Sequence, residues 1–69
     1  MNYEELLIAA DEAGLIVKEK PLALHDGRIK GTRIAIRQDI PTLARKADVL
    51  AEELGHYFTS VGEILDQRT

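Results

Sequence analysis

The apolar residues at the start of the chain recur every three or four positions, which is the spacing of one face of an α-helix. They are Tyr3, Leu6, Leu7, Ala10 and Ala13. Asn2, followed three residues later by Glu5, fits a reciprocal cap at a helix start. Gly14 fits the end of the helix, because glycine commonly follows the last helical residue. The pattern predicts an amphipathic first helix that packs on the rest of the protein.

The next two segments have the composition and alternation of β-strands. Residues 15–20 (LIVKEK) are β-branched at the start and are followed by Pro21, which suits a short strand. Turn residues then flank Arg28 and Ile29, and residues 32–37 alternate with period two, which indicates a hairpin. Its predicted apolar face consists of Ile29, Ile34 and Ile36. The pattern leaves the exact strand pairing open.

A second helix is predicted from Thr42 to about Tyr57 or Phe58, with Pro41 in its first turn and a helix exit at residues 59–62. Its apolar stripe at 3.6-residue spacing consists of Leu43, Ala47, Leu50, Ala51, Leu54 and Phe58. The stripe is expected to pack on the first helix and the sheet. The opposite side of the helical wheel carries Val49, Glu52, Glu53 and His56, so these residues are expected to face away from the core.

Two features suggest that something covers this outward side. Val49 and Tyr57 are apolar residues beside the charged ones. Gly55 lies inside the predicted helix, where glycine costs about 1 kcal/mol against alanine and usually marks a close approach by another group. A second layer is therefore expected over this part of the helix.

Length and composition limit the class of protein. The 69 residues are expected to form one small α+β domain, 1–69, with an N-terminal helix, a small antiparallel or mixed sheet with a hairpin, and then the second helix. A chain of this size buries only about 60% of its unfolded surface. The absence of cysteine excludes disulfides and thiolate zinc sites and fits the cytoplasm. No apolar run reaches the ~20 residues of a membrane span, and the first residues are acidic where a signal peptide would be basic.

The charges do not favour contact with nucleic acid. The formal net charge is −3, and charges of both signs are interspersed. Arg28, Lys30, Arg33 and Arg37 do cluster. Because these basic residues alternate with isoleucines, they are better interpreted as the solvent-exposed face of strands than as a phosphate-binding patch.

The segment Glu52-Glu53-Leu54-Gly55-His56 has the form of the zincin motif H-E-x-x-H with its first histidine replaced by glutamate. Residues four apart on a helix share a face, so Glu52 and His56 could bind one metal ion, and Glu53 holds the position of the general base. The alternative is a solvated helix face, on which such residues are common. His25, beside a turn, is expected to be an exposed turn residue rather than a third metal ligand.

Residues 34–36, 49–57 and 59–66 together resemble the ImmA/IrrE family of zinc metallopeptidases, in particular small members encoded by phages and integrated elements. Residues 15–21 and 26–31 look like the same group. The resemblance covers nearly the whole chain. Its combined motifs are much more specific than E-E-x-x-H alone.

The resemblance implies a zincin-like fold, a bound zinc ion, and cleavage of protein substrates, namely repressors with helix-turn-helix domains. By position, His56 would be a zinc ligand and Glu53 the general base, while Glu52 stands where the family generally has its first ligand histidine. The family's third ligand, an acidic residue on a later helix, would lie beyond Thr69. We therefore expect the N-terminal half of a metallo-endopeptidase, as a fragment or short form that is inactive by itself.

A second interpretation remains open. The chain could be a zincin-derived interaction module that no longer hydrolyses anything. It would bind a regulator, or form a homodimer, through the side of the helix around Val49, His56 and Tyr57.

Overall fold

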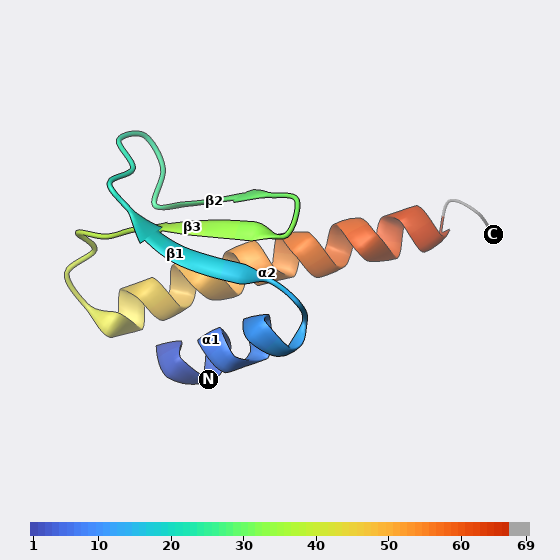
Figure 1. Cartoon of the computed structure of the whole chain (residues 1–69), viewed down its shortest axis with the longest axis horizontal. Coiled ribbons are helices and arrows are strands. Elements are labelled where there is room, and N and C mark those ends of the chain that lie inside the picture. Colours follow the sequence, from blue (N-terminus) through green and yellow to red (C-terminus); the bar gives the residue numbers. More distant parts are fainter. Residues whose placement is uncertain (67–69) are drawn as a thin grey trace.

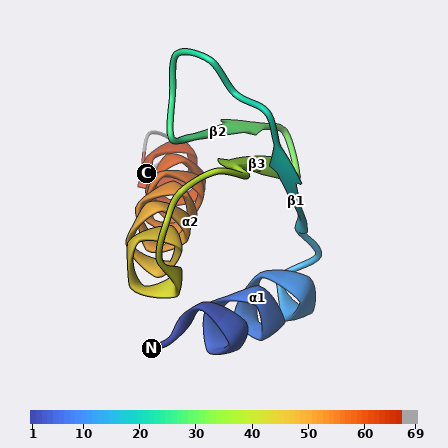
Figure 2. The same cartoon turned by 90° about the vertical axis from the view of Figure 1, so that its left-hand side faces the viewer.

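The computed structural model describes the backbone of residues 1–66 and the side chains of residues 1–59. The elements, in chain order, are α1 (Tyr3–Glu12), β1 (Ile16–Lys20), β2 (Gly27–Lys30), β3 (Arg33–Arg37) and α2 (Leu43–Asp66). Figures 1 and 2 show a small twisted sheet with α1 and α2 packed beside it. The α+β class predicted from the sequence is confirmed.

Helix α1 begins and ends as its sequence predicts. The Asn2 side chain accepts a hydrogen bond from the Glu5 backbone N–H at 2.8 Å, and the Glu5 carboxylate accepts one from the Asn2 N–H at 2.9 Å. Both donors would otherwise lack a partner at the helix start. After the helix, Gly14 adopts a φ of 81°, a left-handed conformation that glycine enters without steric cost. The chain thereby turns directly into β1.

The sheet has the order β1-β3-β2, so the last strand along the chain lies in the centre. The predicted hairpin is formed by β2 and β3, which pair antiparallel with Ile29 opposite Ile34. Gly31, at a φ of 61°, is the first residue of the two-residue loop between them, a position that favours glycine. β1 pairs with β3 in parallel. This arrangement requires residues 21–26 to carry the chain from one edge of the sheet to the other.

The core lies between one face of the sheet and the two helices. Its most buried large side chains are Ile34, Ile36 and Leu50, none of which is more than 1% exposed. Ile34 and Ile36 lie on the predicted apolar face of the hairpin, and Leu50 lies on the predicted stripe of the second helix. Ile29 is partly buried against the same cluster.

The predicted stripe of α2 is only partly correct. Ala47, Leu50 and Leu54 are buried, but Leu43, Ala51 and Phe58 are exposed. Val49 and Glu53, which were expected to face outward, are buried at 6% and 7% exposure. The physical reason is that α2 contacts α1 on one side and the strands β2 and β3 on the other. Two neighbours at different angles bury a wider arc of the helix than one apolar stripe covers.

The predicted limits of α2 also need correction. Thr42 precedes the helix and caps it, because its Oγ1 accepts a hydrogen bond from the Arg45 N–H at 3.1 Å. Pro41 therefore lies outside the first turn. At the other end the helix continues to Asp66, so the predicted exit at residues 59–62 is wrong. Those residues are weak helix formers, but only proline would interrupt a helix strongly, and none is present.

Candidate functional site

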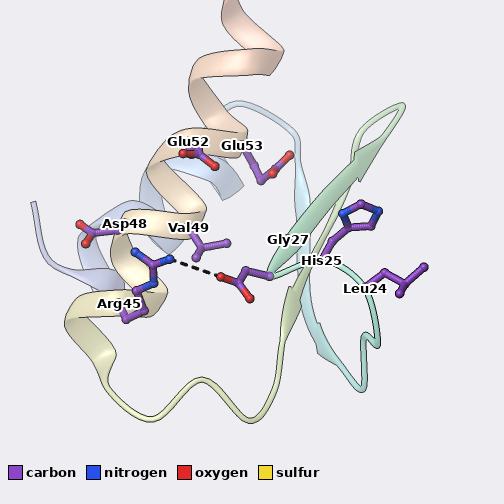
Figure 3. A pocket seen from close by; sticks show the side chains of 9 residues that line it. Leu24, His25, Gly27, Arg45, Asp48, Val49, Glu52 and Glu53 are labelled. Atoms are coloured by element: carbon purple, nitrogen blue, oxygen red, sulfur yellow. Dashed lines mark hydrogen bonds and ion pairs between the residues drawn. The ribbon is translucent and has the colours of Figure 1, made fainter.

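The three residues of the zincin-like motif lie on one turn of α2 but in different environments. Glu52 and His56 are exposed, as expected for residues one helical turn apart on an outer face. Glu53 is buried, so the prediction that the whole motif faces away from the core is wrong for this residue. Figure 3 shows its side chain extending from α2 toward β2, while Glu52 lies beside it on the helix.

The position of Glu53 depends on a close approach between α2 and the first residue of β2. A Cβ atom at Gly27 would lie 2.6 Å from Val49 Cγ1 and 3.3 Å from Glu53 Cγ. Real Cβ atoms essentially never come as close to another atom as the first distance. Glycine at position 27 is therefore what allows the strand backbone to pack directly on the helix at the candidate general base.

The close approach expected at Gly55 is absent from the described part of the chain, because a Cβ atom there would meet nothing within 4 Å. The structure thus places the tight glycine on the strand rather than on the helix. From the sequence, Gly27 is expected in a turn before Arg28. The signal that could have indicated its role is its location at the start of a strand, where glycine often marks close backbone packing.

Among the described side chains, His56 makes the one ion-pair contact of Glu53. Its Nδ1 lies 3.9 Å from Glu53 Oε1, which is too long for a hydrogen bond but within ion-pair distance for a protonated imidazole. The His56 side chain is 65% exposed and the Glu53 side chain 9%. The carboxylate is therefore largely shielded from solvent by the protein, while the imidazole is accessible to a ligand from solvent.

An open cleft of about 470 Å³ lies beside Glu53, between α2 and the loop that leads into β2. The loop contributes residues 24–27. The helix contributes Arg45, Asp48, Val49, Glu52 and Glu53. The size is within the range of small-ligand sites, and the cleft is open to solvent.

Charge in this cleft is mainly negative. Asp26 is neutralised, since it forms ion pairs with Arg37 at 3.0 Å and with Arg45 at 3.4 Å. Asp48, Glu52 and Glu53 have no cationic partner of this kind among the described side chains other than the distant His56 contact. The cleft therefore favours a cationic group, either a metal ion or a basic side chain of a ligand.

His25 does not join the motif. It is exposed, as predicted for a turn residue, and Figure 3 shows its ring directed away from Arg45 and from the two glutamates of α2. Among the described residues, no group of three or more His, Cys, Asp or Glu side chains has an arrangement that could hold a metal ion. Glu52 and His56 thus offer two candidate ligands, whereas a catalytic zinc site uses three protein ligands and a water molecule.

Within residues 1–66, neither helix is both long enough and apolar enough to cross a membrane. No protein-family model, no curated protein and no solved structure matches this chain.

Proposed function

We propose that this protein supplies the peptide-binding half of a zincin-like metallo-endopeptidase and that it binds a protein substrate without cleaving it by itself. The observation that carries the proposal is the burial of Glu53 against Gly27 of β2, beside an open cleft. The order of elements also supports it, because a helix, a small sheet and a long helix carrying E-E-x-x-H is the arrangement that the ImmA/IrrE resemblance implies.

The strand β2 suits the binding of an extended peptide. It forms one edge of the sheet, with β3 on its inner side. An edge strand presents unpaired backbone N–H and C=O groups, to which a peptide can add as a further strand. Because Gly27 begins this strand, a peptide bound there would pass close to Glu53 and the acidic cleft. A helix-turn-helix repressor is the substrate class that the resemblance implies, and the cytoplasm is the corresponding location.

Zinc is the metal that the resemblance implies, and the described residues do not complete a site for it. Glu52 and His56 have suitable donor atoms, but two ligands are one fewer than catalytic zinc requires. Hydrolysis would need a further ligand from another segment or another chain. In a complete enzyme Glu53 would be the general base, as its position in the motif implies.

Two measurements on the purified chain test this proposal. After incubation with zinc and dialysis, metal analysis is expected to find no stoichiometric zinc, and the melting temperature is expected not to change with added zinc. Retention of one zinc ion per chain, lost in a His56→Ala variant, would show a complete metal site and contradict the half-site. Incubation with the repressor encoded beside its gene is expected to give a complex but no cleavage products.

A matched pair of variants distinguishes the cleft from the rest of the surface. Glu53→Gln removes the buried charge beside the cleft, whereas Glu12→Gln removes an exposed charge at the end of α1, outside the cleft lining. Binding that depends on Glu53 and little on Glu12 supports the proposed site. Absence of any complex would refute the proposed binding. Cleavage by the wild-type chain that disappears in Glu53→Gln would refute the proposed lack of hydrolysis.

The alternative function, an interaction module without any role in hydrolysis, is favoured by one observation. Phe58 is 54% exposed and packs edge-to-face on Tyr57, with the ring centroids 5.3 Å apart. This aromatic pair, one and two residues after His56, could contact a partner. Val49 belongs to the core and cannot take part in such a surface. If Phe58→Ser abolishes binding of the repressor and Glu53→Gln leaves it unchanged, the module is the better description.

A further inference from the structure

The face of the sheet that points away from both helices is strongly cationic. Side chains alternate across a strand, so the neighbours of the buried Ile34 and Ile36 lie on the outer face. Six of the outward side chains are cations. Arg37 forms ion pairs with Asp26 and Asp39, and we call the other five the basic face: Lys18, Lys20, Arg28, Lys30 and Arg33. All five are exposed. Together with Ile16 and Ala35 they line a shallow groove of about 370 Å³.

No acidic side chain of the strands offsets these charges. The one acidic residue in the three strands is Glu19, which points to the helices, where it binds Lys46 at 2.9 Å and Tyr3 at 3.0 Å. Within the described part of the chain, none of the five cations forms an ion pair. A chain whose net charge is −3 therefore concentrates more than half of its nine Lys and Arg residues on one small surface.

This arrangement costs stability. Lys30 and Arg33 are directly opposite each other in the hairpin, and like charges in that position destabilise a sheet. Arg28 and Lys18 flank Ala35 on the next row of the same face, so further repulsion is added there. A purely structural outer face would gain by mixing signs, as most protein surfaces do. The uniformly positive charge of this face indicates that it binds an anionic group of another molecule.

The form of the surface indicates which anion. Two apolar residues lie among these cations: Ala35, half-buried on the central strand β3, and Ile16, 46% exposed at the start of the edge strand β1. The chain's three aromatic residues all lie on the helices, so the sheet offers no ring on which a base could stack. Nucleic acid is therefore a poor fit. A helix with an apolar stripe between acidic residues matches both the two apolar residues and the cations around them.

We propose that the basic face binds an acidic amphipathic helix of a partner protein. The dimensions agree, since three strands span about 10 Å between the edges and a helix with its side chains is about 10–12 Å wide. The parallel pairing of β1 with β3 also agrees, because parallel strands are mostly found in sheets that are covered on both faces. This surface is separate from the candidate cleft, and its occupation does not depend on the proposed function.

The test uses a fluorescent helical peptide of about 15 residues with a leucine and alanine stripe flanked by glutamates. A peptide with lysines in place of the glutamates is the control ligand. Fluorescence anisotropy is expected to show binding of the acidic peptide alone. Raising the salt from about 0.01 M to about 1 M shortens the screening length from about 30 Å to about 3 Å and is expected to weaken this binding strongly.

Three variants that each remove one positive charge locate the binding site. Lys18→Gln and Arg28→Gln are each expected to weaken binding about two- to fivefold. Arg45→Gln, off this face on α2, is expected to leave it unchanged. Lys30→Glu places opposite charges across the hairpin, so it is expected to raise the melting temperature by about 2–8 °C while weakening binding. A loss of binding in Lys30→Glu therefore cannot be attributed to unfolding.

Several results would overturn the inference. They are failure of the acidic peptide to bind, an equal loss of affinity in Arg45→Gln, and tighter binding of a single-stranded oligonucleotide or of anionic lipid vesicles at the same salt concentration. The last two would assign the basic face to nucleic acid or to a membrane surface instead.

Discussion

Replacing Gly27 with alanine tests the contact that positions Glu53. The added methyl group would lie 2.6 Å from Val49 Cγ1, and a valine on a helix cannot easily rotate away because one χ1 rotamer dominates. Forcing extra volume into a packed site costs about 1–3 kcal/mol. Alanine recovers about 0.4–1 kcal/mol by restricting the unfolded chain. We expect a net loss of about 1–2 kcal/mol, or a fall of about 4–16 °C in melting temperature.

Val49→Ala supplies the compensating change. This variant removes two carbon atoms from a side chain that is 6% exposed, which is expected to cost about 1–3 kcal/mol by itself. In the double variant the methyl group added at position 27 fits into the space that the valine side chain leaves. The loss in free energy of unfolding of the double variant should therefore be smaller than the sum of the two single losses by about 1–3 kcal/mol.

Urea unfolding followed by far-UV circular dichroism measures all three variants. Gly55→Ala is the matched control, because a Cβ atom at that position meets nothing within 4 Å and alanine is favoured over glycine in a helix by about 1 kcal/mol. It is expected to stabilise the protein. A neutral Gly27→Ala variant, or strictly additive effects of the two core substitutions, would refute the packing of β2 on α2 at this point.

Three further predictions concern the helix ends, the core and pH. Thr42→Ala is expected to lose about 0.5–2 kcal/mol with its cap, and Leu50→Ala about 2–5 kcal/mol from the centre of the core, both measured by urea unfolding. Burial, together with the hydrogen bond to Glu19 and the charge of that residue, raises the pKa of Tyr3 from 10.0 to about 12. Its contribution to stability is therefore complete below pH 10 and is lost as the pH rises toward 12. Glu19→Gln should move the Tyr3 pKa, followed by ultraviolet absorbance, part of the way back toward 10; an unchanged value would contradict the hydrogen bond.

At Glu19, stability is lost when the pH falls rather than when it rises. The hydrogen bond from Lys46 lowers the pKa of Glu19, with a smaller contribution in the same direction from Tyr3. A lowered pKa in the folded state stabilises the protein above the ordinary value of 4.5, and this contribution disappears as the pH falls through the lowered pKa. The Glu19 carboxylate thus ties α1, β1 and α2 together at neutral pH.

Features that depend on neighbouring residues in the sequence were predictable. The Asn2 cap needs only residues within one turn, and the alternation that buries Ile34 and Ile36 needs only one strand. The burial of Val49 and Glu53 was not predictable in this way. It depends on the close approach of β2 to α2, which a glycine more than twenty residues earlier in the chain allows. A helical wheel centred on apolar residues has no information about a second neighbour.

The membership of the basic face was also only partly predictable from local sequence patterns. Local alternation correctly placed Arg28, Lys30 and Arg33 on the wet side of a hairpin. It could not add Lys18 and Lys20, because their presence on this face follows from the parallel pairing of β1 with a strand that is not its neighbour in the chain. It also could not remove Arg37, whose charge is neutralised by Asp26 and Asp39. The gathering of five cations on one face of the described sheet is therefore a property of the topology, and an isolated hairpin of this sequence should bind the acidic peptide more weakly than the whole protein does.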